Sequence, residues 1–316
     1  MRILFAGTPE IAVPSLKALA EKFEVCAVLT NPDRETGRGR KIISSPVCEA
    51  ARELGLKVLQ PEKLDEPFLE EVKALKPDLL AVIAFGKIFR KNFLELFPLG
   101  GINLHPSLLP KYRGPSPLSE AIRKGDRKTG ISVQKLALKM DSGDIILQPE
   151  LELDGRETTG SLTEKVAELG APLMVQAVEI LTKNPGAGTA QADSEATFCK
   201  LITKEDGLID WTSAAEEIER NIRAYSPWPG TYSWYEGKKI NILEADLYDG
   251  DAPEGTPGSV LSFSKKEGIL VATGSGVLAV KRLQLQSKKP MDYKSFVNGN
   301  REFVGSILQS PSGDSE

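Results

Sequence analysis

The chain has 316 residues and a formal net charge of −4, so it is long enough to bury a full hydrophobic core and to form two domains. Hydrophobic residues make up 41% and charged residues 27%, as in ordinary globular proteins, and no apolar run is long enough to cross a bilayer. Residues 1–6 lead into an apolar strand and not into a signal peptide. The net charge argues against a surface covered by nucleic acid but is compatible with a local basic patch. Three widely spaced cysteines argue against a disulfide framework or zinc site and favour a reducing cytoplasm: Cys26, Cys48 and Cys199.

Predicted strands and helices alternate through the first third of the chain. Leu79–Ala84 is a continuous apolar run, as expected for a strand that is covered on both faces. We predict strands at 2–7, 25–30, 57–59, 79–84 and 101–105, separated by helices at 14–22, 45–54, 65–75 and 88–96. This alternation predicts an α/β fold, with a Rossmann-like, doubly wound and mostly parallel sheet.

In the remaining two thirds of the chain the regular alternation of strands and helices gives way to short strands in close succession. We predict helices at 115–124, 163–182 and 214–225, and strands at 130–137, 145–152, 231–235, 239–248, 258–263, 268–273 and 276–285. The short strands in close succession predict a small OB-like β-barrel. We therefore expect an α/β domain over 1–185, a polar linker over 186–205, the barrel domain over 206–309 and a disordered tail over 310–316.

The stretch Gly101–Pro110 carries the strongest candidate for chemistry. Asn103 and His105 are two residues apart, so on a strand they point to the same face. His105 is the only histidine in the chain, and it falls at the carboxyl end of a strand, where parallel sheets bind ligands. A strand-end histidine can simply satisfy a neighbouring carbonyl group. A polar pair on a buried strand is costly unless it is used, however, so we interpret this stretch as the active site.

Asp141 lies in a glycine-containing loop, Lys139–Asp144, that could reach the end of that strand. There it could orient His105 and keep it protonated, while His105 and Asn103 stabilise an oxyanion. The alternative is an ordinary turn aspartate, which is the interpretation we prefer for Asp144. For Asp141 the spacing alone does not decide between the two.

The segment 31–41 is polar and too glycine-rich for a regular element, so we predict a loop. Its basic residues outnumber its acidic ones, and composition alone favours a solvated surface. It lacks the spacing of a phosphate-binding or dinucleotide-binding loop. A second basic cluster lies near the end of the barrel, and binding to a nucleic-acid backbone and a solvated face are equally good interpretations of it. That cluster consists of Lys281, Arg282, Lys288, Lys289 and Lys294.

Three motifs together resemble the signature of the 10-formyltetrahydrofolate-dependent formyltransferases. They are Asn103-x-His105, then Ser107-Leu108-Leu109-Pro110, and then Asp141-x-Gly143. The resemblance extends over about residues 1–305, from Phe5-Ala6-Gly7-Thr8-Pro9 to Pro227-Trp228-Pro229. It implies that Asn103, His105 and Asp141 are catalytic and that no metal is needed. It also implies a folate site formed by Ile83, Phe85, Gly86, Ser107, Leu108, Leu109 and Pro110.

Within that family the chain is most similar to the branch that formylates an aminoacylated tRNA. The pattern Asp33-Arg34-x-x-Gly37-Arg38-Gly39 resembles the inserted loop with which that branch engages the acceptor end. The resemblance thus implies contacts to tRNA from Arg34, Arg38, Arg40 and Lys41. It also implies formyl transfer from 10-formyltetrahydrofolate to the methionine amine of initiator methionyl-tRNA, for translation initiation. We expect a cytoplasmic monomer without a membrane partner.

Other functions remain compatible with the same residues. The acceptor could be a small amine, such as a sugar nucleotide or glycinamide ribonucleotide, although residues 206–305 argue against the latter. A folate-dependent hydrolase could use the same three catalytic residues to release formate. A non-catalytic RNA-binding protein would use only the barrel and the basic loop.

Overall fold

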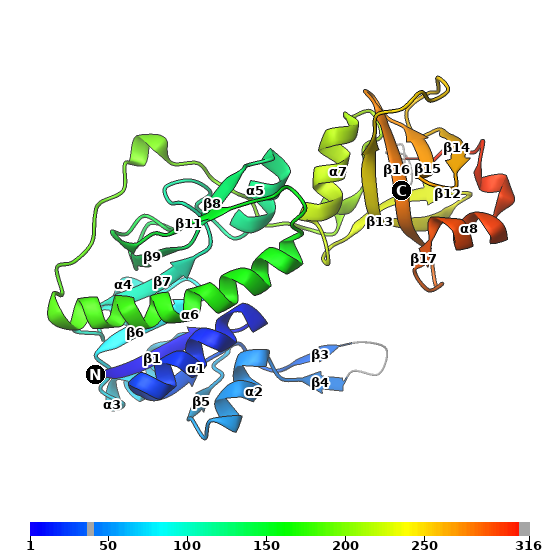
Figure 1. Cartoon of the computed structure of the whole chain (residues 1–316). Helices are drawn as coiled ribbons and strands as arrows, with labels where there is room; N and C mark the ends of the chain where they lie inside the picture. Colours follow the sequence, from blue (N-terminus) through cyan, green and yellow to red (C-terminus); the bar gives the residue numbers. More distant parts are fainter. Residues whose placement is uncertain (37–40, 310–316) are drawn as a thin grey trace. The chain divides into compact units, whose positions relative to one another are not determined.

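The computed structural model describes residues 1–36 and 41–309, so the expected disordered tail and the tip of the basic loop lie outside the described residues. The chain divides into two compact units (Figure 1). The first unit comprises Met1–Pro117, Lys128–Glu152 and Leu162–Cys199. The second unit comprises Leu118–Arg127, Leu153–Ser161 and Lys200–Glu316. No helix in the described ranges is both long and apolar enough to cross a membrane.

A seven-stranded sheet forms the centre of the first unit. Its strand order is β10 (Ile145–Leu147), β9 (Ser132–Lys135), β7 (Gly101–His105), β6 (Leu79–Ile83), β1 (Arg2–Gly7), β2 (Glu24–Leu29) and β5 (Val58–Leu59). The five strands β7, β6, β1, β2 and β5 pair in parallel, whereas β9 pairs antiparallel with both of its neighbours, β7 and β10. The predicted doubly wound, mostly parallel sheet is confirmed, because helices connect the parallel strands as the alternating sequence pattern requires.

Helices cover both faces of this sheet. The face that carries Leu80 and Val82 packs against two helices, α3 (Glu66–Ala74) and α4 (Lys91–Leu94). The other face packs against α6 (Thr159–Lys183), where a Cβ atom at Gly170 would overlap the side chain of Leu104. Further helices and short strands in the first 183 residues include α1 (Val13–Lys22), α2 (Pro46–Glu53), α5 (Pro117–Lys124), β8 (Lys128–Gly130) and β11 (Glu150–Glu152). Since side chains alternate along β7, Asn103 and His105 lie on the face opposite to α6.

The basic loop is partly a β-hairpin, and our prediction of an irregular segment was wrong there. Strand β3 (Arg34–Thr36) pairs antiparallel with β4 (Lys41–Ile43). The carboxylate of Asp33 fixes the base of the hairpin by accepting hydrogen bonds from Gln60 at 2.7 Å and from Ser44 at 3.1 Å. Glycine content misled the prediction, because a hairpin needs only short β-prone arms and an anchored base.

The second unit contains an all-antiparallel sheet that closes into the predicted OB-like barrel. Its order is β12 (Thr231–Tyr235), β13 (Lys238–Tyr248), β16 (Val277–Leu285), β15 (Gly268–Ala272) and β14 (Val260–Ser264), with β17 (Met291–Asp292) beside β16. Residues 307–309 close it, because Gln309 bridges to Trp234 and Ile307 bridges to Ser259. Two helices accompany the sheet: α7 (Ala215–Ala224) and α8 (Tyr293–Gly299), the second of which we did not predict.

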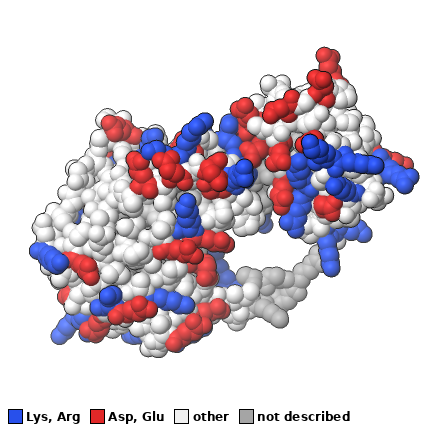
Figure 2. All heavy atoms as spheres, viewed as in Figure 1, with Lys and Arg blue, Asp and Glu red and all other residues white. Residues whose placement is uncertain are grey.

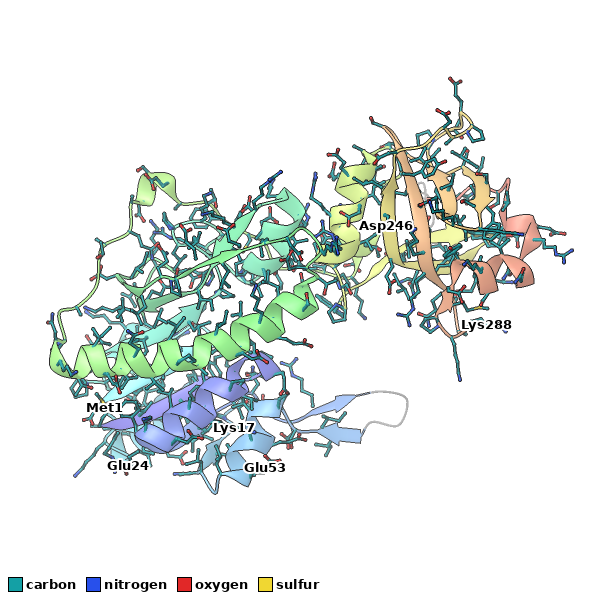
Figure 3. All side chains as sticks on the ribbon, in the orientation of Figure 1. Met1, Lys17, Glu24, Glu53, Asp246 and Lys288 are labelled. Carbon is teal, nitrogen blue, oxygen red and sulfur yellow. The ribbon has the colours of Figure 1, made fainter. Side chains whose placement is uncertain are left out.

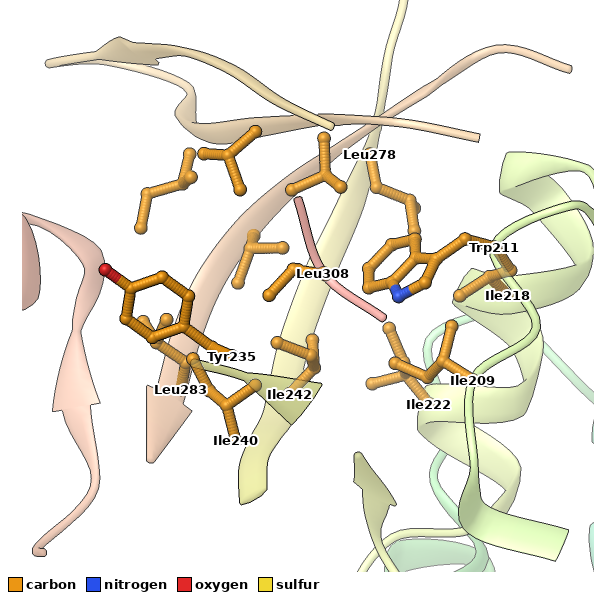
Figure 4. Packing of buried hydrophobic residues seen from close by; sticks show 14 of the residues in the cluster. Ile209, Trp211, Ile218, Ile222, Tyr235, Ile240, Ile242, Leu278, Leu283 and Leu308 are labelled. Carbon is orange, nitrogen blue, oxygen red and sulfur yellow. The ribbon is translucent and has the colours of Figure 1, made fainter. Parts of the chain in front are cut away.

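The core of the second unit lies between this sheet and α7 (Figure 4). Trp211 is 3% exposed, and its indole donates a hydrogen bond to Ser233 at 3.0 Å. Leu278 and Leu283 from β16 and Ile222 from α7 complete the packing. The second unit therefore has a hydrophobic core of its own.

Candidate active site

The carboxyl end of β7 holds the first two candidate residues. The register pairs Asn103 with Gln134 of β9 and His105 with Ser132. Directly opposite residues of two antiparallel strands share a face, so Asn103 and Gln134 lie side by side. His105 is 4% exposed, and Asn103 is half-buried. No group within the described ranges hydrogen-bonds the Asn103 side chain, so its amide is available to a ligand.

The Lys139–Asp144 loop does reach the end of β7. One carboxylate oxygen of Asp141, Oδ2, lies 3.6 Å from Nδ1 of His105. The same oxygen accepts a hydrogen bond from the Gly114 backbone at 2.9 Å, and Oδ1 accepts one from Gln134 at 3.0 Å. Asp144 points elsewhere and lies 4.0 Å from the ammonium group of Lys135. The structure thus brings Asn103, His105 and Asp141 together and leaves Asp144 outside the group.

The loop is folded tightly around Asp141. The φ angle of Asp141 is 49°, in the left-handed region that side chains other than glycine rarely adopt. Two residues later, a Cβ atom at Gly143 would overlap the carbonyl oxygen of Lys135. Glycine is therefore required at this position for the loop to approach β9 closely.

Burial dominates the electrostatics of His105. It lowers the pKa of His105 below 6.5, although the Asp141 carboxylate and the Tyr112 carbonyl both act to raise that pKa. Nε2 lies 2.9 Å from the Tyr112 carbonyl oxygen, and a carbonyl only accepts, so Nε2 carries a proton. The lowered pKa favours a neutral imidazole, with its proton on Nε2. Burial thus acts against the protonated form that we expected Asp141 to maintain, because loss of hydration outweighs the nearby carboxylate.

The side chains of the predicted folate motif are partly turned into the protein. Ser107 is completely buried and donates to the Lys111 carbonyl at 2.6 Å, and Leu109 is 3% exposed. The backbone between them is also fixed, since Ser132 donates to the Ser107 carbonyl at 2.7 Å. Leu108 and Pro110 are half-buried. Most backbone groups of the motif are already paired, since the Leu109 nitrogen donates to Ser132 and the Leu109 carbonyl accepts from Gln148. This motif can therefore offer a ligand mainly the surfaces of Leu108 and Pro110.

The segment after β6 is arranged in the same way. Ile83 and Phe85 are each 1% exposed, and the ring of Phe85 stacks on Phe89 at 5.4 Å. Gly86 is exposed and has a φ angle of 81°. Asn31 holds the turn by donating a hydrogen bond to the Phe85 carbonyl at 2.9 Å. The buried Phe85 ring supports this turn from the protein interior, and the backbone at Gly86 is exposed on its surface.

Of the four basic residues predicted to contact tRNA, the structure describes only the Arg34 side chain. Arg34 is exposed and lies opposite Ile43 in the hairpin. Arg38 and Arg40 lie outside the described residues, as does the side chain of Lys41.

Sequence reasoning missed the polar residues that hold Asp141 in place. Gln134 is 1% exposed, and Arg113 is completely buried. Gln191 lies between them, in the stretch that we expected to be a linker. Their sequence positions gave no signal, because each acts through residues that are distant along the chain. Within the described ranges, no group of three or more His, Cys, Asp or Glu residues could hold a metal ion.

The tight loop gives a first prediction. We expect Gly143→Ala to lower the free energy of unfolding by about 1–3 kcal/mol, because the added methyl group must displace the Lys135 carbonyl. Gly299→Ala is the control, since a Cβ atom there meets nothing within 4 Å. Urea unfolding of both variants measures the difference. Equal stabilities would contradict the close approach of the loop to β9.

Comparisons with known proteins agree with this architecture. Residues 1–178 match the formyl transferase family, and residues 201–301 match the formyl transferase C-terminal domain. Methionyl-tRNA formyltransferase of Treponema denticola is 45% identical over 316 residues, covering 96% of this chain and 98% of the relative.

Two solved structures share the fold. Methionyl-tRNA formyltransferase from Clostridium thermocellum has a TM-score of 0.56 at 21% identity, covering 79% of this chain and 95% of that one. HypX from Aquifex aeolicus, solved in complex with tetrahydrofolic acid, has a TM-score of 0.62 at 19% identity, covering 100% of this chain and 50% of that one. With both domains matched and a 45% identical relative over nearly its whole length, the chain belongs to the methionyl-tRNA formyltransferase family.

Proposed function

We propose that this protein transfers the formyl group of 10-formyltetrahydrofolate to the methionine α-amino group of initiator methionyl-tRNA. The observation that carries the proposal is the group of Asn103, buried His105 and Asp141 at the carboxyl edge of the sheet. The family membership of the chain supports the same substrates. The reaction belongs to translation initiation in the cytoplasm, and the proposed complex contains one copy of the chain.

Asn103 stabilises the first intermediate in this proposal. The amine attacks the formyl carbon, a C–N bond forms, and the carbonyl electron pair moves onto oxygen. The Asn103 amide has no partner among the described residues, so it can donate a hydrogen bond to that oxyanion. A donor that is fixed on a β-strand needs no reorganisation when the charge appears.

The His105–Asp141 pair transfers the proton. The attacking nitrogen becomes positively charged and must lose a proton, which a neutral imidazole can accept. The Asp141 carboxylate, 3.6 Å from Nδ1, stabilises the imidazolium that forms. As the bond from the formyl carbon to N10 breaks, the pair returns the proton to N10, and tetrahydrofolate leaves.

We place the folate against the two walls beside the catalytic group. One wall is the turn at Ile83, Phe85 and Gly86, and the other is the motif from Ser107 to Pro110. The first wall has buried side chains behind the exposed backbone of Gly86, and the second offers the surfaces of Leu108 and Pro110 to a flat ring.

We assign tRNA binding to the hairpin and to the second unit. Arg34, Arg38, Arg40 and Lys41 would contact the acceptor end from the hairpin. Figure 2 shows Lys and Arg side chains gathered on the second unit, over β16, β17 and α8. Ion pairs with Asp246 and Glu244 offset part of this charge, at 3.1 Å from Lys281 and 3.2 Å from Arg282. Lys288, labelled in Figure 3, has no such ion pair within the described ranges, so it remains available to a phosphate backbone.

These assignments give each domain a separate function. Residues 1–185 would form the catalytic domain and residues 206–309 the tRNA-binding domain. Residues 186–205 would link them, with 189–199 packed on the first unit, and the strand-closing segment at 307–309 belongs to the barrel.

Formyl transfer to methionine-charged initiator tRNA tests the chemistry. We expect Asn103→Ala to lower kcat by about 10²–10³-fold, because an oxyanion donor is lost. Asn241→Ala removes an asparagine from a strand of the second unit and should leave kcat unchanged. Full activity of Asn103→Ala would contradict the proposed role. If the wild type consumes the folate without formylating the tRNA, the acceptor is a small amine or water.

The hairpin gives a separate prediction. We expect Arg34→Ala combined with Arg38→Ala to raise KM for the tRNA, and to weaken its salt dependence by about one phosphate contact for each arginine. The KM for the folate should not change. Lys17→Ala is the control, since it removes one exposed positive charge from α1 (Figure 3). A variant with the wild-type salt dependence would exclude the hairpin from the tRNA interface.

A further inference from the structure

Residues 189–199, here called the strap, contact both the Lys139–Asp144 loop, which carries Asp141, and the turn that follows β7. Thr189 pairs with Ile145 through backbone hydrogen bonds of 2.8 and 2.9 Å. Further along, the Arg113 backbone nitrogen donates to the Thr197 carbonyl at 2.9 Å, and the Cys199 nitrogen donates to the Arg113 carbonyl at 2.9 Å. The strap therefore belongs structurally to the first unit, although it follows the last long helix of that unit.

Gln191 is the strap residue that reaches the catalytic loop. Its Oε1 accepts hydrogen bonds from Nε and Nη2 of Arg113 at 3.1 and 2.8 Å. A guanidinium group only donates, so this atom is the oxygen and the other is the amide nitrogen. That nitrogen faces three oxygens: the Asp141 carbonyl at 2.9 Å, the Gly143 carbonyl at 2.7 Å and Oε1 of Gln134 at 3.1 Å.

Each carboxylate oxygen of Asp141 is held by a group next to the Arg113–Gln191 contact. Oδ1 is held by Gln134, whose own amide is oriented by Gln191. Oδ2 is held by the backbone nitrogen of Gly114, the residue that follows Arg113. Gln191 also holds the Asp141 carbonyl, which fixes a residue in the sparsely populated left-handed conformation.

The charge of Arg113 is compensated from the strap itself. Arg113 is completely buried, and its Nη1 lies 2.8 Å from a carboxylate oxygen of Asp193. The other oxygen of Asp193 accepts a hydrogen bond from Lys139, at the start of the catalytic loop, at 2.8 Å. These two cations hold the pKa of Asp193 below its usual value. The strap thus contacts the loop with a neutral amide and also with an ion pair.

We propose that Gln191 is a positioning residue for catalysis, which sets the Asp141 carboxylate against His105 through the Arg113–Gln191–Gln134 chain of hydrogen bonds. The inference rests on the proposed formyl transfer for its kinetic readout. It does not make Gln191 a contact of either substrate. Because Gln191 joins the Asp141 loop to Arg113 in the turn after β7, any displacement of Gln191 changes the geometry of the Asp141 carboxylate.

Gln191→Glu removes the amide donor and places a negative charge beside the oxygens that the amide contacts. The new carboxylate keeps the shape and the oxygen that faces Arg113, but it cannot donate to the Asp141 and Gly143 carbonyls. We expect kcat to fall by about 10–100-fold, as for a small displacement of a catalytic group, while KM for folate and for tRNA stays within about twofold. We also expect faster amide hydrogen exchange in residues 136–144. Glu195→Gln, an exposed change on the same strap, should alter neither readout.

Three outcomes would overturn the proposal. They are an unchanged kcat, a raised KM at constant kcat, and unchanged exchange of the loop. Gln191→Met replaces the first variant if Gln191→Glu does not fold, because methionine is similar in length and carries no charge. Hydrogen exchange needs no substrate, so it tests whether Gln191 stabilises the Lys139–Asp144 loop even if the wild type fails to formylate the tRNA. The failure of this inference is therefore distinguishable from the failure of the proposed function.

Discussion

The arrangement of the active site depends on one buried interaction, between the Asp141 carboxylate and the His105 imidazole. Burial favours the neutral imidazole, and the carboxylate 3.6 Å away makes a proton on it less costly. The pair can therefore accept a proton during the reaction and release it afterwards. Neither property alone would suffice, because a solvated histidine would be a weaker partner for Asp141 and an isolated buried one would not accept the proton.

Much of the surrounding structure holds that carboxylate still. Groups from three separate parts of the chain converge on Asp141: the turn after β7, strand β9 and the strap. The parallel sheet supplies a rigid edge, and the loops supply only short, fixed extensions from it. This explains why polar residues without a chemical role, such as Gln134 and Arg113, are as deeply buried as the histidine.

The sequence predicted what depends on local pattern. The period of two along β7 placed Asn103 and His105 on one face, and the alternation of elements predicted the parallel sheet. The family resemblance, and not the spacing, selected Asp141. Three features could not be predicted: the direction of the His105 pKa depends on tertiary burial, the paired arms of the hairpin depend on the Asp33 anchor, and Gln191 acts across 50 residues of sequence. All three arise from contacts that are distant along the chain.

A pH titration of His105 tests the central claim most directly. The chain contains one histidine, so an untagged protein gives a single imidazole signal by NMR. We expect it to titrate below pH 6.5 in the wild type, since burial lowers its pKa, and at still lower pH in Asp141→Asn, since the carboxylate that raises that pKa is removed. A wild-type pKa at or above 6.5, or an Asp141→Asn variant with an unchanged pKa, would contradict the account.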